Sequence, residues 1–325
     1  MIGLNKVVYI VLTYNGGDMP IKAINDILSV EGENIPLILV DNGSHVDYSD
    51  YLQNTLRREG FSVLKEKEWR YFHKLPNNKR LLFVLERNRL YAGGNRLGAM
   101  LAYSLGYKIA IFSNDDIELK QPVSGDILEF FDRYSDVGII GPNVLHDIGD
   151  AFKLLGPVEL FSSLDSYKSI TKLALGDKLS NLLFSGESKR GYEYVDNCIV
   201  VPWVSGAFFS ARLEPLIAVN GFRYRRFLGW EEYELSEKMR RKGLKTVLCP
   251  NIGEVYHLVG QTTSNKKKVS YQRYVLGEID AVSHLYGSWD RRFDIYGRLL
   301  AVNLYKLGLT PVGLWHKLKN LARRG

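Results

Sequence analysis

The stretch Tyr107-Lys108-Ile109-Ala110-Ile111-Phe112-Ser113-Asn114-Asp115-Asp116 indicates the fold class of this chain. Its apolar run, Tyr107–Phe112, is typical of a strand that is buried on both faces of a parallel sheet. The run leads directly into two adjacent carboxylates, Asp115 and Asp116. Ligands of open parallel sheets bind at the carboxyl ends of the strands, so these carboxylates lie where a site is expected.

Strand-like and helix-like segments alternate around this stretch, which predicts an α/β fold with a mainly parallel sheet flanked by helices. The other predicted strands are Val7–Leu12, Leu37–Val40, Leu81–Leu85 as the third in order, and Val137–Ile140. The predicted helices begin at Asp18 and Pro20, run from Ala92 to Gly106 with Leu97, Leu101 and Leu105 on one stripe, span roughly 124–134, and run from Glu231 to Lys242. Residues 145–200 give no assignable pattern, and the chain beyond 270 reads as helical.

Polar clusters follow four of the predicted strands directly. They are Thr13-Tyr14-Asn15, Asp41, Glu86–Asn88 and Asp115-Asp116. Because the strands are parallel, these clusters are expected to line one crevice. Asp, Asn and Gly also form ordinary turns, so a plain turn at Asp41 stays open as an alternative.

The adjacent carboxylates Asp115 and Asp116 suggest a divalent cation. Magnesium or manganese would relieve their repulsion through oxygen ligation and would also bind diphosphate oxygens. A solvated turn is the alternative. His257, which follows an apolar segment, is a candidate ligand for the metal or a phosphate, although a single histidine is more often a hydrogen-bonded core residue.

Two further stretches have functional and purely structural interpretations. Tyr91–Gly98 is a glycine-rich helix start, which lets backbone approach an anionic ligand but lacks the dinucleotide and phosphate-loop patterns. Trp230-Glu231-Glu232-Tyr233-Glu234 places three carboxylates at a helix start. They either complement the helix dipole or supply a general base at the edge of a cleft.

The net charge of +7 is concentrated at the C-terminus. Residues 298–325 carry six of the 43 basic residues and no acidic one, which leaves 37 basic against 36 acidic residues elsewhere. A nucleic-acid binder spreads basic and aromatic residues over one face, so that class is not favoured. The leucines, Trp315 and basic residues of 298–325 instead predict an amphipathic helix on an anionic membrane surface, or one packed on the catalytic domain.

The cysteines and the start of the chain suggest a cytoplasmic protein. Cys198 and Cys249 have neither a disulfide-framework nor a metal-site spacing, so they are expected to be reduced thiols. The chain starts without a signal-peptide pattern, and no segment reaches the roughly 18 uninterrupted apolar residues of a membrane span.

Taken in order, the motifs resemble those of family 2 glycosyltransferases with the GT-A fold, and among them the rhamnosyltransferase-like members. The matching stretches are Val11-Leu12-Thr13-Tyr14-Asn15, Val40–Ser44, Glu86–Asn95, Asn114-Asp115-Asp116, Ser205-Gly206-Ala207, Gly221-Phe222 and Glu231–Leu235. The resemblance covers roughly residues 5–263. It implies a GT-A catalytic domain over 1–263, with a nucleotide-sugar half (1–120) and an acceptor half (121–263), and a helical basic extension over 264–325.

The resemblance also implies roles for the matching residues. The nucleoside and the donor pocket would involve Thr13, Asn15, Asp41, Asn88, Gly93, Gly94, Asn95 and Asp115. Asp116 would be the principal metal ligand, with Asp115 and His257 close to the metal or the diphosphate. The general base of the family is usually an aspartate, and Glu232 takes its place here, one methylene longer, with Glu231 in reserve.

The implied reaction is an inverting, metal-assisted transfer of a sugar to a hydroxyl of a glycan or a lipid-linked acceptor. Rhamnose on a UDP or dTDP carrier is the donor that the resemblance favours. Two alternatives remain. A sugar-nucleotide nucleotidyltransferase should carry a basic glycine-rich loop after its first strand, whereas Thr13-Tyr14-Asn15-Gly16-Gly17 stands there. A non-catalytic carbohydrate-binding relative should have lost carboxylates at 115, 116 or 232, and all three are present.

Overall fold

The computed structural model describes residues 6–71, 79–147, 152–154, 193–223, 230–258 and 284. The chain divides into two compact units, Met1–Val158 with Glu193–Lys267, and Glu159–Tyr192 with Lys268–Gly325. All described residues except His284 belong to the first unit. The predicted boundary at 263, the catalytic halves, and the basic helix over 298–325 are not tested and stay predictions.

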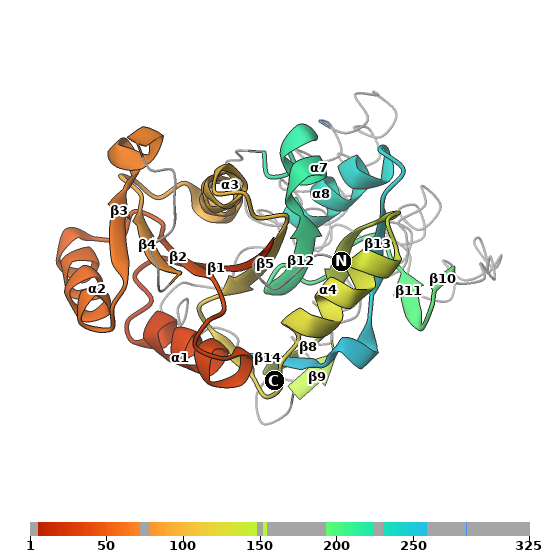
Figure 1. Cartoon of the computed structure of the whole chain (residues 1–325), viewed down its shortest axis with the longest axis horizontal. Helices are drawn as coiled ribbons and strands as arrows, with labels where there is room; N and C mark the ends of the chain where they lie inside the picture. Colours follow the sequence, from red (N-terminus) through yellow and green to blue (C-terminus); the bar gives the residue numbers. More distant parts are fainter. Residues whose placement is uncertain are drawn as a thin grey trace, which may run out of the picture. The chain divides into compact units, whose positions relative to one another are not determined.

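A ten-stranded sheet forms the centre of the first unit (Figure 1). Its spatial order is β10-β11-β13-β7-β12-β5-β1-β2-β4-β3. The strands are β1 (Val7–Thr13), β2 (Leu37–Asp41), β3 (Ser62–Lys65), β4 (Arg80–Val84), β5 (Ile109–Asn114), β7 (Val137–Gly141), β10 (Tyr194–Val195), β11 (Cys198–Val200), β12 (Phe208–Arg212) and β13 (Lys245–Leu248). The strands from β3 to β5 pair in parallel throughout, which confirms the predicted α/β class with a mainly parallel sheet.

The pairing of the large sheet becomes antiparallel beside β5. Strand β12 lies between β5 and β7 and is antiparallel to both. A smaller sheet of β6 (Ile117–Leu119), β14 (Glu254–His257), β8 (Asn143–Asp147) and β9 (Phe152–Leu154) follows the order β6-β14-β8-β9. The small sheet matters for the site because β6 begins directly after Asp116.

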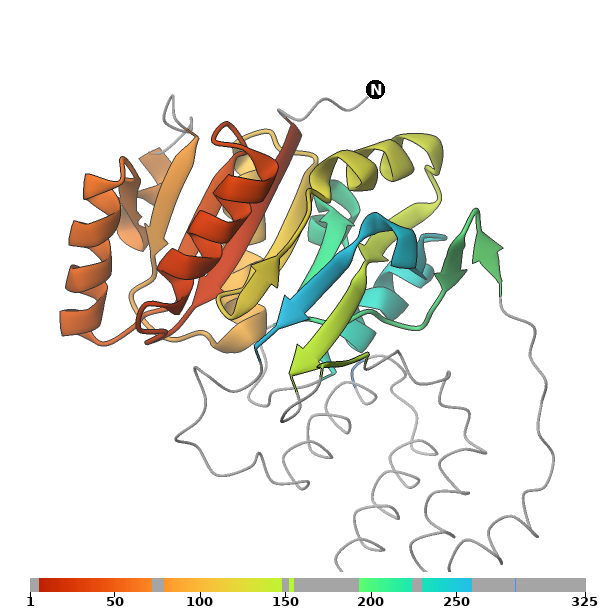
Figure 2. The same cartoon turned by 90° about the horizontal axis from the view of Figure 1, so that it is seen from below.

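Helices cover both faces of the large sheet. They are α1 (Met19–Glu31), α2 (Val46–Arg58), α3 (Leu90–Ser104), α4 (Ser124–Arg133), α7 (Leu213–Ala218) and α8 (Glu231–Arg240), with short 3-10 turns η2 (Glu66–Tyr71) and η3 (Pro250–Ile252). One apolar cluster joins α1, α2 and α4 to alternate strand residues such as Tyr9 and Val11. The other joins α3, α7 and α8 to the intervening residues such as Val8 and Ile10. Strand side chains alternate between faces, so β1 supplies both clusters. Figure 2 looks onto the face that α1, α2 and α4 cover.

Helix α3 packs closely on the sheet because glycines face it. A Cβ on Gly98 would press against Ile10 and Val40, and a Cβ on Gly94 would overlap Leu12. The predicted leucine stripe is therefore only part of the contact. Leu101 is fully buried, whereas Leu97 and Leu105 pack at the margin of the cluster.

Several elements were not anticipated, among them α2 and β3. Helix α2 is largely polar, with Leu52 and Leu56 as its fully buried apolar residues. Strand β3 has four residues and lies at the end of the sheet order. The strand predicted at Leu81–Leu85 is thus the fourth along the chain rather than the third, and it pairs with β2 as a parallel neighbour.

The expectation of reduced thiols is wrong, because Cys198 and Cys249 form a disulfide. They lie 51 residues apart in the sequence, but β11 and β13 are antiparallel neighbours with Ile199 paired to Leu248. This register brings the two cysteines opposite each other. Their separation in the sequence gave no sign of a disulfide, because the pairing of the two cysteines depends on the order of the strands in the sheet. Since disulfides persist mainly in oxidising compartments, the cysteines no longer support a cytoplasmic location, which stays a prediction.

No helix in the described part of the chain is long and apolar enough to cross a membrane.

Replacing both cysteines with alanine should lower the free energy of unfolding by about 2–4 kcal/mol, because the cross-link restricts the unfolded chain. Urea denaturation with tryptophan fluorescence would measure the change. A reducing agent should destabilise the native protein by a similar amount and leave the double variant unaffected. Two titratable thiols in the unfolded, unreduced native protein would contradict the disulfide.

Candidate functional site

The predicted polar clusters meet at one edge of the large sheet. Thr13 at the end of β1 is in register with Asp41 at the end of β2. Leu12 is in register with Asn114, so β5 ends at the same level. Asp41 is in register with Val84, the last residue of β4. The parallel strands therefore bring these segments to one edge, as the sequence predicts.

Asp115 is held by a buried hydrogen bond between the ends of β1 and β5. The Thr13 hydroxyl donates to Oδ2 of Asp115 at 2.6 Å, and both residues are almost fully buried. Gly16 lies against the same carboxylate, and a Cβ on it would overlap Oδ2. Asp115 therefore faces the β1–α1 loop. The need for a glycine at position 16 was not recognised in the sequence.

Asp115 is easier to protonate than an ordinary aspartate. Burial raises the pKa of its carboxyl to about 7. The hydrogen bond from Thr13 lowers the pKa, and the neighbouring carboxylate of Asp116 raises it. A nearby cation would favour the ionised form and oppose the rise, so this carboxylate is sensitive to any charge that enters the site.

The small sheet brings His257 to Asp116. Strand β14 is antiparallel to β6, with His257 opposite Ile117, and the Leu258 amide donates to the Asp116 carbonyl at 2.9 Å. As a result, Nε2 of His257 lies 3.0 Å from Oδ1 of Asp116. The fold thus brings these two residues into contact, although they are far apart in the sequence.

These residues fit a magnesium or manganese ion whose ligands come partly from the protein and partly from a diphosphate. Oδ1 of Asp116 is buried and accepts no hydrogen bond of ordinary geometry within the described residues. With His257 Nε2, it offers one oxygen and one nitrogen ligand. Among the described residues, no three His, Cys, Asp or Glu side chains are grouped as a complete metal site. Two protein ligands suffice where substrate oxygens and water complete the coordination, as is common for magnesium.

Asp41 faces inward, toward its own loop. It is fully buried, its Oδ1 accepts the Ser44 amide at 3.1 Å, and its Oδ2 accepts the Ser49 hydroxyl at 2.6 Å. The carboxylate therefore fixes the β2–α2 turn. The role expected for Asp41, a hydrogen bond to a base or ribose, stays a prediction.

Asn15 and Asn88 also hold loops at this edge. Asn15 adopts a left-handed backbone (φ 52°), and its Oδ1 accepts the His45 amide at 2.9 Å. Asn88 Oδ1 accepts the Leu90 amide at 2.7 Å. Asn42, which was not among the predicted site residues, accepts the Arg89 amide and donates to the Leu90 carbonyl. These bonds hold the start of α3 against the end of β2.

The glycine-rich stretch lies inside α3, which begins at Leu90, earlier than predicted. Gly93, Gly94 and Asn95 are all buried. The absence of a side chain at Gly94 leaves room for Asn42 and Leu12. Asn95 is 1% exposed, and its Oδ1 has no hydrogen-bond partner among the described residues. Gly94 therefore allows α3 to lie close to the sheet edge.

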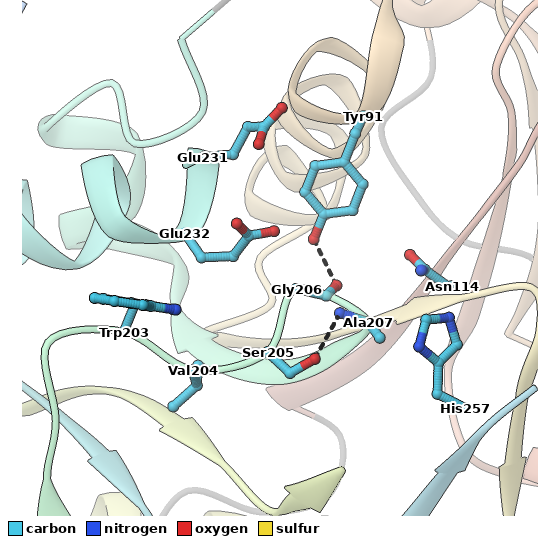
Figure 3. Close-up of a pocket in the computed structure, with 10 residues that line it drawn as sticks. All are labelled: Tyr91, Asn114, Trp203, Val204, Ser205, Gly206, Ala207, Glu231, Glu232 and His257. Carbon is cyan, nitrogen blue, oxygen red and sulfur yellow. Dashed lines mark hydrogen bonds between the residues drawn. The ribbon is translucent and has the colours of Figure 1, made fainter. Parts of the chain in front are cut away.

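A cavity of about 320 Å³ opens beside the carboxylates (Figure 3). It is lined by Tyr91, Asn114, Trp203, Val204, Ser205, Gly206, Ala207, Glu231, Glu232 and His257. The amide of Asn114 donates to the Ala207 carbonyl at 2.9 Å, which ties the end of β5 to the loop before β12. The cavity thus has His257 and Asn114 on one side and the start of α8 on the other.

Glu231 and Glu232 differ in exposure. Glu231 is 4% exposed, whereas Glu232 is only partly buried and extends toward Gly206 in Figure 3. A Cβ on Gly206 would overlap Oε1 of Glu232, so the carboxylate rests directly on this glycine. Glu234, the third acid, is buried in ion pairs with Arg223 and Lys238 at 3.0 and 2.8 Å. Glu232 is therefore the carboxylate best placed to meet a molecule in the cavity.

An aromatic cluster supports the start of α8. Trp203, Trp230 and Tyr233 lie with ring centroids 5.6–6.0 Å apart. Trp230 precedes α8 with a left-handed backbone (φ 69°), which is costly for a bulky residue. Trp203 lines the cavity and was not among the residues predicted for the site. An isolated tryptophan in a segment without a clear pattern gave no signal for its role.

Comparison with known proteins supports the fold. No protein-family model and no curated protein sequence matches the chain. Among solved structures, GalNAc-T7 with UDP, GalNAc and Mn²⁺ is similar at a TM-score of 0.56 and 13% identity, over 86% of this chain and 47% of that one. The chain therefore spans about half the length of GalNAc-T7.

Two further structures are similar at a TM-score of 0.50. The mannosyltransferase PcManGT from Pyrobaculum calidifontis, in complex with GDP-Man and Mn²⁺, is 12% identical, over 98% of this chain and 79% of that one. S. aureus TarS 1–349 in complex with UDP-GlcNAc is 13% identical, over 89% of this chain and 70% of that one. Together with GalNAc-T7, they show that this chain has the GT-A fold.

In the metal-free protein, Asp115 should make stability depend on pH. Its pKa in the folded state, about 7, exceeds the value near 3.9 expected in the unfolded chain, so the folded state binds the proton more tightly. Its contribution is complete below about pH 4 and is lost as the pH rises through 7. Relative to Asp115→Asn, the native protein should lose roughly 2–4 kcal/mol over this range in chelator-treated urea titrations.

The control is Asp126→Asn, which alters an exposed aspartate on α4. This variant should follow the native pH profile. A difference between native protein and Asp115→Asn that stays constant from pH 4 to 8 would contradict the raised pKa.

Proposed function

We propose that this protein is an inverting glycosyltransferase that moves a sugar from a nucleoside-diphosphate donor to a hydroxyl group of a glycan or lipid-linked acceptor. The observation that carries the proposal is the cavity shared by Glu232, Asn114 and His257, with Asp116 beside His257. Glu232, the proposed base, and His257, which lies on the side proposed for the diphosphate, thus line the same cavity. The three similar structures contain UDP, GDP-Man or UDP-GlcNAc, and two of them contain Mn²⁺.

Glu232 would act as the general base. Its carboxylate takes the proton from the acceptor hydroxyl as the hydroxyl oxygen attacks the anomeric carbon, on the face opposite the departing nucleotide. A carboxylate is a weak base toward an alcohol, so the proton moves late, as the transition state forms. Glu231 is the reserve candidate, since it lines the same cavity.

Asp116 and His257 would hold the divalent cation on the diphosphate side. When bound, magnesium or manganese stabilises the negative charge that develops on the leaving diphosphate. Asp115, bonded to Thr13, would fix the backbone that presents Asp116. The loop that contains Asn15 and the start of α3 would enclose the nucleoside, and Asp41 would shape that pocket through Ser44 and Ser49.

The finer assignments are also proposals. Rhamnose on a UDP or dTDP carrier is the donor we place first. We propose that residues 1–120 bind the donor, that 121–263 bind the acceptor, and that the basic segment 298–325 contacts an anionic membrane surface on its cytoplasmic side. The six basic charges of that segment would be drawn to anionic lipids.

Calorimetry with UDP, dTDP and GDP, with and without Mn²⁺, should reveal metal-dependent binding of one nucleotide. Asp116→Ala should weaken that binding at least roughly 100-fold, because it removes a ligand for the bridging cation. Asp126→Ala, on the surface of α4, serves as the matched control and should bind as the native protein does. Absence of binding to all three nucleotides with Mn²⁺ present would overturn the proposed donor.

Glu232→Gln should keep nucleotide affinity within about twofold and lower kcat by roughly 10²–10⁴-fold, because the amide cannot accept the proton. Turnover is followed as donor hydrolysis, in which water takes the place of the acceptor hydroxyl and nucleoside diphosphate is released from UDP-glucose, UDP-GlcNAc, GDP-mannose or dTDP-rhamnose with Mn²⁺. Glu231→Gln is the comparison. If Glu231→Gln abolishes turnover while Glu232→Gln retains it, the base is Glu231.

A further inference from the structure

Tyr91 connects helix α3 with the loop before β12 at the edge of the cavity. It lies in the first turn of α3, on the side of the glycine-rich stretch, and its hydroxyl donates to the Gly206 carbonyl at 2.6 Å (Figure 3). Gly206 belongs to the loop that precedes β12. This bond joins segments 115 residues apart in the sequence. A phenylalanine at position 91 would leave that carbonyl without this donor.

Gly206 in turn limits where Glu232 can lie. Oε1 of Glu232 occupies the space that a side chain on residue 206 would need. A displacement of the Gly206 backbone toward α8 would therefore push the carboxylate, and a displacement away would remove this contact. Since catalytic geometry is sensitive to shifts of about 1 Å, the position of this backbone bears on reactivity.

The anchor for this contact is fixed independently of Glu232. The ring of Tyr91 packs edge-on against Phe222, with centroids 6.3 Å apart and planes at 80°. The preceding residue, Leu90, has a left-handed backbone (φ 58°) and is held by hydrogen bonds with Asn88 and Asn42. The backbone of Leu90 is therefore held in one conformation, which fixes the direction in which α3 starts and, with it, the place of the Tyr91 hydroxyl.

The hydroxyl of Tyr91 remains a donor near the two acids. Burial raises its pKa well above the usual value of 10, and the negative charges of Glu232 and Glu231 raise it further. The phenol is therefore neutral throughout the physiological range. Tyr91 thus does not act as a base, and its proton stays available to the Gly206 carbonyl.

We propose that Tyr91 is a positioning residue that holds the Gly206 loop through its hydroxyl and thereby sets the place of the Glu232 carboxylate. The inference rests on the proposed function, because it assigns Glu232 the role of base. It adds a link between the donor-side helix α3 and the acceptor-side base. A shift of the α3 start when the donor binds would reach Glu232 through one hydrogen bond and one van der Waals contact.

A double-mutant cycle tests the link. Tyr91→Phe keeps the ring and removes the hydroxyl. In the native background it should lower kcat for donor hydrolysis roughly 10–100-fold and leave the donor KM within about twofold. In the Glu232→Gln background it should change kcat less than about twofold, because the group it positions is already gone. Tyr103→Phe, on the exposed face of the same helix, should match the native protein in both backgrounds.

Amide hydrogen exchange supplies a readout that needs no activity. Peptides covering 201–208 should exchange faster in Tyr91→Phe than in the native protein or in Tyr103→Phe. Unchanged exchange there, an equal loss of kcat in both backgrounds, or a change confined to KM would overturn the positioning role. Failure of the native protein to release nucleoside diphosphate from any of the four donors would instead overturn the proposed function, and with it the effect of the Tyr91 contact on turnover.

Discussion

The site depends on the burial of two adjacent carboxylates at the end of a parallel strand. Placing charge in a desolvated position is costly, so the neighbouring chain must compensate. The hydroxyl of Thr13 bonds Asp115, and the missing side chain of Gly16 leaves room for the carboxylate. Strand β14 brings His257 to Asp116. The end of β1 with its following loop holds Asp115, and β14 holds a residue against Asp116, so the two carboxylates depend on segments far apart in the sequence.

The antiparallel strand β12 brings a second segment, the loop before it, to the edge of the sheet where β5 ends. A strand that runs opposite to β5 begins where β5 ends, so the loop before it lies at the carboxyl edge. Asn114 is tied to that loop through the Ala207 carbonyl. A wholly parallel sheet would need a crossover connection there and could not place Gly206 and Ala207 so near the end of β5. The mixed topology thus brings the loop against which Glu232 packs close to Asp115 and Asp116.

The sequence allowed the centre of the fold to be predicted because apolar runs such as Val7–Leu12 and Val137–Ile140 are typical of buried strands. It also placed Thr13 and Asp115 at one edge, since parallel strands end together. Helix α2 was missed because few of its residues are apolar, and β3 because it is only four residues long. Contacts that depend on strand order left no trace in the local pattern, among them Cys198 with Cys249 and Tyr91 with Gly206.

Leu90 is the first residue of α3 and Trp230 immediately precedes α8, and both have left-handed backbones that glycine would adopt without strain. The molecule thus gives up some thermodynamic stability at both walls to keep two side-chain-bearing residues there. A search for thermostabilised variants would be drawn to these positions, since relieving such strain is an easy gain. Glycine at these two positions would also loosen the starts of α3 and α8. A more heat-resistant form of this protein would then have a less well-ordered cavity.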